Sequence, residues 1–357
     1  MKIEDKIALH KQWWEKTNER PLVHIFPPSP AVKTSGEKKK SGVFDVDISP
    51  DEMIARKCKS ICGKDYAWSD NLPVANVNFG PAFLPGLAGA AFEHDGNTVW
   101  THPCAESAED LHIGPLDPGN PVWRNYIGKF KRLLADWREH DYLPGPANIV
   151  GPMDCVAAML GPENLSMELM LHPEAVQRAA MDAAKLFMEV LTIETQMLRE
   201  AGLQGGVVDW MHTWLPGVGR CYSEDYSALC GEDLFREFFL EPNAWIAERI
   251  DTPYLHIHSG AYLCMPAILE IPGLKAVELS NDPNGPDLDK YLATARMIQE
   301  AGLSLQVSNW ERPLERRAIE KILNTLDPRG LKVTLQATRT GEAEQLYGLV
   351  TVVRVET

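Results

Sequence analysis

Two histidines, His256 and His258, stand two residues apart in a short apolar run that begins after Pro253 and ends in Ser259-Gly260. A run of this length, closed by turn residues, predicts a buried strand. Because residues two apart on a strand point to the same side, both imidazoles should project together from its carboxyl end. Paired imidazoles suit a metal ion or a polar ligand. A pair of core histidines bound to backbone carbonyls is the alternative, and both interpretations stay open.

Polar side chains also follow the other predicted strands, and two of them, Asp209 and His212, are candidate catalytic groups. Asp209 suits a metal ligand, a proton acceptor, a substrate-positioning carboxylate or a structural cap, while His212 lies in the loop beyond it. The candidate substrate-binding residues at strand ends are Asn76, Asn78, Trp210, Trp214, Asn309, Trp310 and Gln336. The tryptophans fit either an aromatic pocket or a tryptophan-rich core.

Eight short apolar runs are the predicted strands that position these residues. They lie at 22–26, 74–79, 148–151, 206–210, 253–258, 274–279, 303–307 and 331–335. Amphipathic stretches predict helices between nearly all of them, which indicates an α/β fold with parallel strands. Eight strands over 357 residues favour a closed (β/α)8 TIM barrel over a doubly wound sheet. Functional groups of such a barrel gather at the carboxyl ends of its strands.

No linker divides the chain, so residues 1–357 are predicted to form a single barrel domain. Residues 1–70 would form an N-terminal helical and loop extension. Within it, residues 27–50 are rich in Pro, Ser, Gly and Lys, which predicts a long flexible loop or lid.

The composition of the chain and the motifs that it lacks argue against several kinds of partner and cofactor. A net charge of −15 argues against nucleic acid or an anionic membrane as a partner. No window approaches the roughly 18 apolar residues that a membrane span needs. Seven cysteines at scattered spacings favour reduced thiols in a cytoplasmic protein. No Gly-x-Gly-x-x-Gly motif follows the first strand and no P-loop is present, so nucleotide cofactors are unsupported.

Several short motifs follow one another in a characteristic order. They are Asn78-Phe-Gly-Pro-Ala-Phe83, Gly89 through Thr98-Val-Trp100, Gly161-Pro-Glu-Asn-Leu165, Gly206-Val-Val-Asp-Trp210 and Leu255-His-Ile-His-Ser-Gly260. In this order and spacing, the chain from about Asn78 to its end resembles the uroporphyrinogen decarboxylase superfamily. Within that superfamily it is most similar to the branch of cobalamin-dependent methyltransferases.

In that branch, zinc is held by a His-x-Cys pair on the fifth strand and a cysteine near the last strand, and an acidic residue of the next strand can complete the site. By this resemblance, His256 matches the histidine, His258 stands where the first cysteine would be, and Glu278 matches the acidic residue. The late cysteine has no counterpart, because Val333 to Gln336 occupies its region. The resemblance therefore implies a zinc site on His256, His258 and Glu278 that is harder than a thiolate site and has an open position.

Such a site suits the polarisation of an ether or alcohol oxygen, so the resemblance implies O-demethylation. The chain would move a methyl group from a methoxylated or other methylated small molecule to cob(I)alamin. That cobalamin would belong to a separate corrinoid protein, because nothing in the chain resembles a cobalamin-binding motif. Asp209 or His212 would orient the substrate or manage a proton. Barrels of this superfamily often pair, so the expected assembly is a homodimer.

A decarboxylase of the same superfamily is the main rival. Uroporphyrinogen decarboxylases hold their carboxylates with an Arg- and Gly-rich stretch after the first strand, where this chain has Pro27-Pro-Ser-Pro30. Their second-strand aspartate corresponds to Asn76 or Asn78, and Gln336-Ala-Thr-Arg339 replaces their last-strand turn. A lyase for another carboxylated substrate and a non-catalytic small-molecule-binding barrel are the remaining alternatives.

Overall fold

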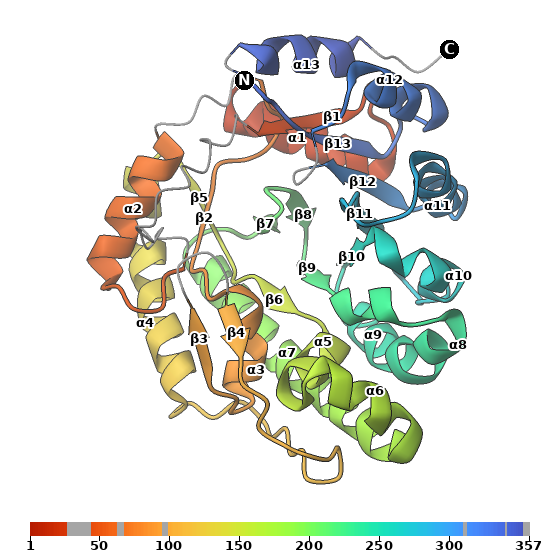
Figure 1. The fold of residues 1–357 in the computed structure, drawn as a ribbon. Helices are drawn as coiled ribbons and strands as arrows, with labels where there is room; N and C mark the ends of the chain where they lie inside the picture. The colour runs from red at the N-terminus through yellow and green to blue at the C-terminus, as the bar shows by residue number, and fades with distance from the viewer. Residues whose placement is uncertain (27–43, 63–67, 95–98, 310–312, 340, 353–357) are drawn as a thin grey trace, which may run out of the picture.

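The computed structural model describes residues 1–26, 44–62, 68–94, 99–309, 313–339 and 341–352 (Figure 1). Within these residues, seven parallel strands form the main sheet, in the order β1-β13-β12-β11-β10-β9-β6. They are Leu22–Phe26 (β1), Ile149–Val150 (β6), Gly219–Ser223 (β9), Thr252–His258 (β10), Ala276–Ser280 (β11), Ser304–Asn309 (β12) and Leu331–Gln336 (β13). Nearly all their positions are buried, as expected of parallel strands covered on both faces.

The register of the sheet decides which side chains share a layer. His256 lies opposite Ser223 of β9 and Glu278 of β11, and Glu278 lies opposite Gln306 of β12. Paired residues of neighbouring strands point to the same side, so these polar side chains project together. The neighbouring Leu255 points to the other side, where the helices pack.

Three two-stranded sheets accompany the main sheet in the described part of the chain. β2 (Val74–Asn76) pairs in parallel with β5 (Leu143–Gly145). β3 (Phe92–His94) pairs antiparallel with β4 (Val99–Thr101), and β7 (Gly206–Val208) pairs antiparallel with β8 (Trp214–Pro216). The run at 206–210 is therefore a hairpin strand and does not join the main sheet as predicted. β9, which is absent from the predicted strands, lies between β6 and β10.

Helices lie around the outside of the strands (Figure 1). They are α1 (Ile3–Glu15), α2 (Pro50–Cys62), α3 (Phe83–Leu87), α4 (Pro121–Asp136), α5 (Pro152–Leu160), α6 (Pro162–Leu171), α7 (Pro173–Glu200), α8 (Glu232–Leu234), α9 (Leu240–Ala247), α10 (Met265–Ile268), α11 (Leu288–Glu300), α12 (Arg316–Thr325) and α13 (Glu342–Thr351). At the start of α4, Pro121 opens the helix, and the Asn120 side chain accepts hydrogen bonds from the first-turn N–H groups. α7 buries an apolar stripe that includes Ala183, Phe187 and Val190.

Short helical segments connect several of these elements. They are η1 (Gly80–Ala82), η2 (Trp137–Glu139), η3 (Asp225–Leu229), the π-helical η4 (Phe235–Phe239) and η5 (Ser259–Cys264). η5 begins directly after β10, and η3 begins two residues after the end of β9. The chain therefore turns sharply where these two neighbouring strands end.

The α/β class predicted from the sequence is confirmed, with a parallel sheet of seven strands among the described residues. Part of the predicted N-terminal extension belongs to that sheet, since β1 pairs with β13 along its whole length. Of the predicted loop at 27–50, residues 27–43 lie outside the described residues. No helix in the described part of the chain is long and apolar enough to cross a membrane.

Candidate functional site

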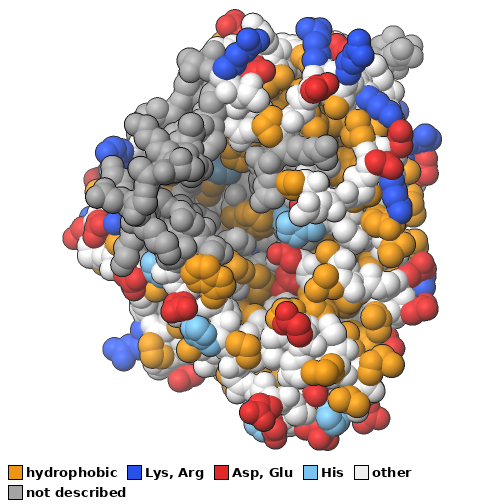
Figure 2. All heavy atoms as spheres, viewed as in Figure 1, with side chains coloured by type: hydrophobic (Ala, Val, Ile, Leu, Met, Phe, Trp, Pro, Cys, Tyr) orange, Lys and Arg blue, Asp and Glu red, His pale blue; other side chains and the backbone are white. Residues whose placement is uncertain are grey.

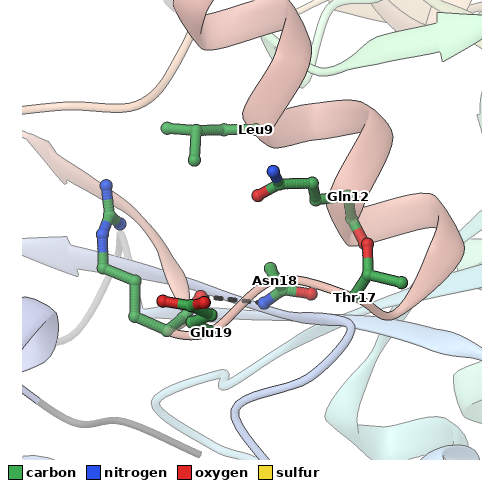
Figure 3. A pocket seen from close by; sticks show the side chains of 6 residues that line it. Leu9, Gln12, Thr17, Asn18 and Glu19 are labelled. Carbon is green, nitrogen blue, oxygen red and sulfur yellow. Dashed lines mark hydrogen bonds between the residues drawn. The ribbon is translucent and has the colours of Figure 1, made fainter.

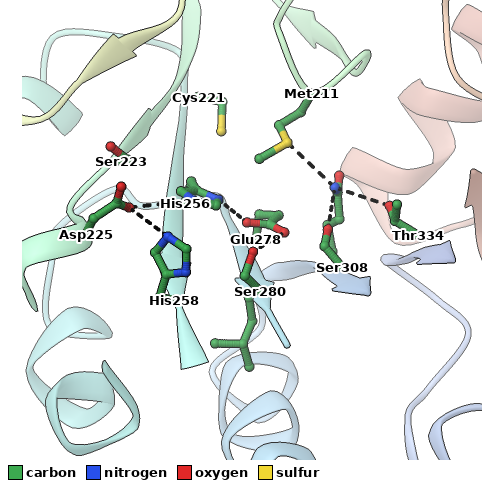
Figure 4. Close-up of polar contacts among 12 residues, drawn as sticks. Met211, Cys221, Ser223, Asp225, His256, His258, Glu278, Ser280, Ser308 and Thr334 are labelled. Carbon is green, nitrogen blue, oxygen red and sulfur yellow. Dashed lines mark hydrogen bonds and ion pairs between the residues drawn. The ribbon is translucent and has the colours of Figure 1, made fainter. Parts of the chain in front are cut away.

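The candidate site lies at the carboxyl ends of β9 and β10. Asp225, His256 and His258 each direct one donor atom to it, and these atoms lie within 4.8 Å of one another. Oδ1 of Asp225 is 3.6 Å from Nε2 of His256 and 3.6 Å from Nε2 of His258 (Figure 4). The structure thus places the predicted histidine pair together with an aspartate that follows β9.

Each imidazole is held at its other nitrogen by a second carboxylate. Glu278 contacts Nδ1 of His256, and Oδ1 of Asp282 is 2.7 Å from Nδ1 of His258. Oδ2 of Asp282 accepts hydrogen bonds of 2.8 Å from the N–H and from the hydroxyl of Ser259. An ionised carboxylate only accepts hydrogen bonds, so each Nδ1 carries a proton and each Nε2 faces Asp225.

This arrangement attracts positive charge. With Nδ1 protonated, a neutral imidazole presents a lone pair at Nε2, and Asp225 Oδ1 faces both rings with further lone pairs. Burial acts to lower the pKa of His256, but the charge and hydrogen bond of Glu278 outweigh it and raise that pKa above 6.5. The hydrogen bond with Asp282 raises the pKa of His258 to about 9 against the effect of burial. A proton or a metal cation at this point relieves the repulsion among the converging acceptors.

The donor set and its spacing fit a divalent metal ion. Nitrogen and oxygen ligands of tetrahedral zinc lie about 2.1 Å from the ion, hence about 3.4 Å from one another. The two distances of 3.6 Å from Asp225 are close to that separation. The His256 side chain is 6% exposed and that of Asp225 is 46% exposed, so the site opens on the Asp225 side. Figure 2 shows histidine and acidic side chains beside a hollow in this face of the molecule.

Glu278, the predicted third ligand, lies against Nδ1 of His256, while Asp225 faces Nε2 on the other side of the ring. Asp225 is not among the predicted site residues. Asp225 stands two positions after the last residue of β9, and Asp282 two positions after the last residue of β11. Recognition of β9 as a sheet strand would have identified Asp225 as an acidic strand-end residue.

A buried carboxylate fixes the backbone that carries Asp225. Oδ2 of Asp154, in the first turn of α5, accepts hydrogen bonds of 2.8 Å from the Ser223 hydroxyl and from the Asp225 N–H. Its Oδ1 accepts a hydrogen bond of 2.8 Å from the Tyr226 N–H. Burial and then the charge of Asp225 raise the pKa of Asp154 to about 7, although the hydrogen bonds act in the opposite direction.

Asp209, a predicted catalytic residue, lies fully buried in the turn between β7 and β8. Its Oδ1 accepts a hydrogen bond of 3.0 Å from the Thr213 N–H, and its Oδ2 has no hydrogen-bond partner among the described residues. Burial raises the pKa of Asp209 above that of an ordinary aspartate. The buried Lys332 holds the same turn by donating to the Met211 carbonyl at 3.0 Å and the Thr213 hydroxyl at 2.7 Å.

Two other predicted residues of this turn, Trp210 and His212, face a cavity of about 210 Å³. The Trp210 ring meets the His256 ring at 72°, with a centroid separation of 5.4 Å, and its Nε1 donates to the Cys221 carbonyl at 3.0 Å. Nδ1 of His212 lies 2.9 Å from the Leu72 carbonyl oxygen. Trp210 therefore belongs both to the cavity wall and to the surroundings of the candidate metal centre.

The remaining predicted substrate-binding residues that the structure describes have contacts within the fold. Oδ1 of Asn78 accepts a hydrogen bond of 2.9 Å from the Gly80 N–H, and Nε2 of Gln336 donates to the Ala337 carbonyl at 3.1 Å. Oδ1 of Asn309 accepts a hydrogen bond of 2.8 Å from Asn281. These contacts hold loops at the strand ends.

Asn76 is half-buried at the end of β2. Trp214 is buried in β8, where it packs in a small apolar cluster with residues such as Leu72 and Val208. Trp310 lies outside the described residues. Of the predicted tryptophans that are described, Trp210 is thus the one that contacts the candidate centre.

A cavity of about 310 Å³ beside the amino end of β1 is lined in part by Gln12, Asn18 and Arg20 (Figure 3). Its polar groups serve the fold: Nδ2 of Asn18 donates to the Arg20 carbonyl at 2.8 Å, and Arg20 pairs with Asp70 at 2.6 Å. Because the sheet is parallel, this cavity lies at the edge opposite the strand ends that carry His256 and His258.

The chain is similar in structure to a methyltransferase from Methanosarcina mazei, with a TM-score of 0.58 over 96% of this chain and 96% of the other. The two sequences are 12% identical, so the likeness is one of fold. No protein-family model matches the chain, and no curated protein does. The fold and the geometry of the site are therefore the basis for a functional proposal.

Proposed function

We propose that this chain is a metal-dependent methyltransferase that moves a methyl group from a methoxylated small molecule to a corrinoid protein. The observation that carries the proposal is the convergence of two imidazole Nε2 atoms and Asp225 Oδ1 at the carboxyl ends of β9 and β10. The likeness in fold to the methyltransferase from Methanosarcina mazei supports the same class of reaction. A methoxylated donor, aromatic or aliphatic, follows from the donor set, because imidazole and carboxylate ligands favour a metal that accepts oxygen ligands.

His256, His258 and Asp225 would hold the metal, and zinc matches these donors and their spacing. When bound, the metal supplies Lewis-acid polarisation of the oxygen that loses the methyl group. Glu278 and Asp282 would hold the Nδ1 protons of the two histidines, a common role of carboxylates beside metal-binding imidazoles. This proposal assigns Glu278 to orienting His256, in place of the ligand role that the family resemblance implies.

The chain's other polar groups would bind the substrate or support the site. Trp210 and His212 line the cavity beside the centre, where the body of the methyl donor would lie. Asp209 uses Oδ1 to hold the turn that carries both residues, so it would act as a positioning group. In the net reaction, cobalt(I) of the acceptor supplies the electron pair of the new Co–C bond. The C–O bond breaks with its pair on oxygen, which then takes up one proton.

The proposed acceptor is a cobalamin carried by a separate corrinoid protein. We further interpret the seven strands of the main sheet, together with β2, as the wall of a (β/α)8 barrel whose mouth would admit this partner. A cytoplasmic location is part of the same proposal and rests on the scattered spacing of the seven cysteines, which is typical of reduced thiols. A homodimer is part of the same proposal and rests on the family resemblance.

The test is anaerobic methyl transfer to free cob(I)alamin by the zinc-loaded chain, with methoxyarenes, methanol and methylamines as donors. The expected result is methylcobalamin together with the demethylated product of at least one methoxylated donor. Asp225→Ala should slow the reaction by about 100-fold or more, since polarisation by a metal contributes several kcal/mol. Asp233→Ala, which changes a fully exposed side chain, is the matched control. Absence of methylcobalamin with every donor would contradict the proposal, and CO2 release from a carboxylated compound would favour the lyase.

A further inference from the structure

The cavity of about 210 Å³ beside Trp210 shares a layer of side chains with the histidine pair. Thr334 of β13 and His24 of β1 line the cavity. Both belong to the register row that starts at His258 of β10 and crosses β11 and β12. Paired residues of neighbouring strands point to the same side of a sheet. The candidate metal centre and the cavity therefore lie on the same side, the centre at β10 and the cavity at β13 and β1.

Flat rings make up much of the cavity wall. Four residues of the described lining carry them, and these are His24, Phe26, Trp210 and His212. Each of the four is partly exposed, as expected of residues that face an accessible space. The His24 ring meets the Phe26 ring edge-on at a centroid separation of 4.3 Å, and it stacks on the His212 ring at 6.1 Å. The wall thus contains rings in the stacked and edge-on arrangements that aromatic groups prefer.

The turn between β7 and β8 holds one of these rings in a strained conformation. His212 has a φ of 57°, a left-handed conformation that is uncommon for a residue other than glycine. Its N–H donates to the Asp209 carbonyl at 2.9 Å, and its own carbonyl accepts from the Leu72 N–H at 3.2 Å. Backbone strain of this kind persists only where the surrounding structure enforces it, and it gathers at ligand sites. The His212 ring is therefore fixed in the wall before a ligand binds.

The volume and the charge of the cavity favour one neutral ring. A cavity of about 150 Å³ accommodates benzene, so a volume of about 210 Å³ has room for one ring with a small substituent. The described lining includes no lysine or arginine, so a carboxylate or phosphate lacks a counter-charge there.

We infer that this cavity binds the aromatic ring of a small neutral molecule and prefers it to a saturated ring of the same size. Trp210 is the specificity-determining residue, because its ring lines the cavity and also contacts the His256 ring at a centroid separation of 5.4 Å. Binding itself does not require the metal. One further step rests on the proposed function: the methyl donor would be a single-ring methoxyarene and not an aliphatic ether.

Calorimetry with anisole and cyclohexyl methyl ether on the full chain in excess chelator tests this inference without the metal. The two probes carry the same methoxy group on a six-membered ring, and burial of apolar area alone favours the saturated one. The wild type should bind anisole about 3- to 10-fold more tightly, the usual effect of one aromatic contact. Trp210→Leu, which keeps an apolar wall but removes the ring, should reduce the preference to less than about 2-fold. Trp245→Leu, at a half-buried position on α9, is the matched control and should retain it.

Three outcomes would overturn the inference. One is the absence of saturable anisole binding to the wild type, and another is equal or tighter binding of cyclohexyl methyl ether. The third is the same preference in the wild type and in Trp210→Leu. The wild-type comparison needs no variant, so it decides the matter even if Trp210→Leu does not fold. Because the chelated chain is used, failure here is separate from failure of methyl transfer.

Discussion

The backbone N–H of Asp225 donates a hydrogen bond of 2.8 Å to the buried carboxylate of Asp154. Asp154 also accepts hydrogen bonds from the Ser223 hydroxyl and from the Tyr226 N–H. It therefore holds the segment at the end of β9 on both sides of Asp225. A metal ligand that stands at the start of a short helical turn needs such support to keep its direction. Asp154 is therefore a positioning residue for the candidate metal centre.

Asp154→Asn should weaken zinc binding by about 10–100-fold, the usual effect of removing a group that orients a ligand. The amide can accept at only one oxygen, so at least one of the three hydrogen bonds is lost. Competition with a chromogenic chelator measures the affinity. Ser223→Ala removes one hydrogen bond of Asp154 but leaves the bond to Asp225, and it should have a clearly smaller effect. Equal losses in the two variants would contradict the positioning role.

Glu278→Gln separates an orienting role from a ligand role. Glu278 contacts Nδ1 of His256, and a glutamine oxygen can still accept from that nitrogen. We expect the variant to bind one zinc per chain at saturation, with an affinity about 10–100-fold lower. Glu237→Gln, at an exposed position, is the control. Loss of stoichiometric binding in Glu278→Gln would show instead that Glu278 is a ligand.

Removal of one partner of the buried ion pair of Arg220 and Glu194 should have a large effect on the stability of the fold. Glu194 of α7 binds Arg220 of β9 and the Tyr126 hydroxyl, and both members of the ion pair are at most 2% exposed. Removal of one partner leaves an unpaired buried charge, so Glu194→Ala should lower the free energy of unfolding by about 3–5 kcal/mol. Asp182→Ala removes an exposed ion pair with Lys185 on the same helix and should cost less than about 1 kcal/mol. Similar urea midpoints for the two variants would contradict this account.

The burial of His10 should make the stability of the fold depend on pH. It is fully buried, with Nε2 against the Asp70 carbonyl at 3.0 Å and Nδ1 accepting from the Trp214 N–H at 3.0 Å. Burial and the charges of Lys332 and Lys6 lower the pKa of His10 to about 3, although the bond to Asp70 opposes them.

The folded state therefore favours neutral His10, and the unfolded chain takes up its proton near pH 6.5. The stabilisation is complete above pH 6.5 and is lost as the pH falls toward 3, by at most about 1.4 kcal/mol per pH unit. Urea unfolding between pH 7 and 5 should show a shallower loss in His10→Gln than in the wild type. His112→Gln, at an exposed position, is the matched control. Parallel curves for the wild type and His10→Gln would show that His10 does not titrate in this way.

The histidine pair could be predicted from the sequence because its geometry is local. Alternation along β10 puts His256 and His258 on one side whatever surrounds the strand. The α/β order of the elements is equally local, because it follows from the spacing of apolar runs and helix starts.

Asp225 could not be predicted because the sequence of the preceding strand, β9, is not typical of a buried strand. β9 contains Arg220, a residue typical of surfaces, and Arg220 is buried there because Glu194 lies 26 positions earlier on α7. The position of Trp214 also depends on a distant part of the chain, since its backbone carbonyl accepts a hydrogen bond of 2.5 Å from Trp14 of α1. Side chains from distant parts of the chain therefore decide which strand-end residues reach the site.

Metal analysis of the purified chain tests the central claim most directly. After equilibration with zinc and removal of the unbound ion, the wild type should hold about one zinc per chain, as expected of a site with three protein ligands. Asp225→Ala and His256→Ala should each lose it, and Asp233→Ala should retain it. Less than about 0.2 zinc per chain in the wild type, or equal zinc content in the wild type and Asp225→Ala, would contradict a metal centre on Asp225, His256 and His258.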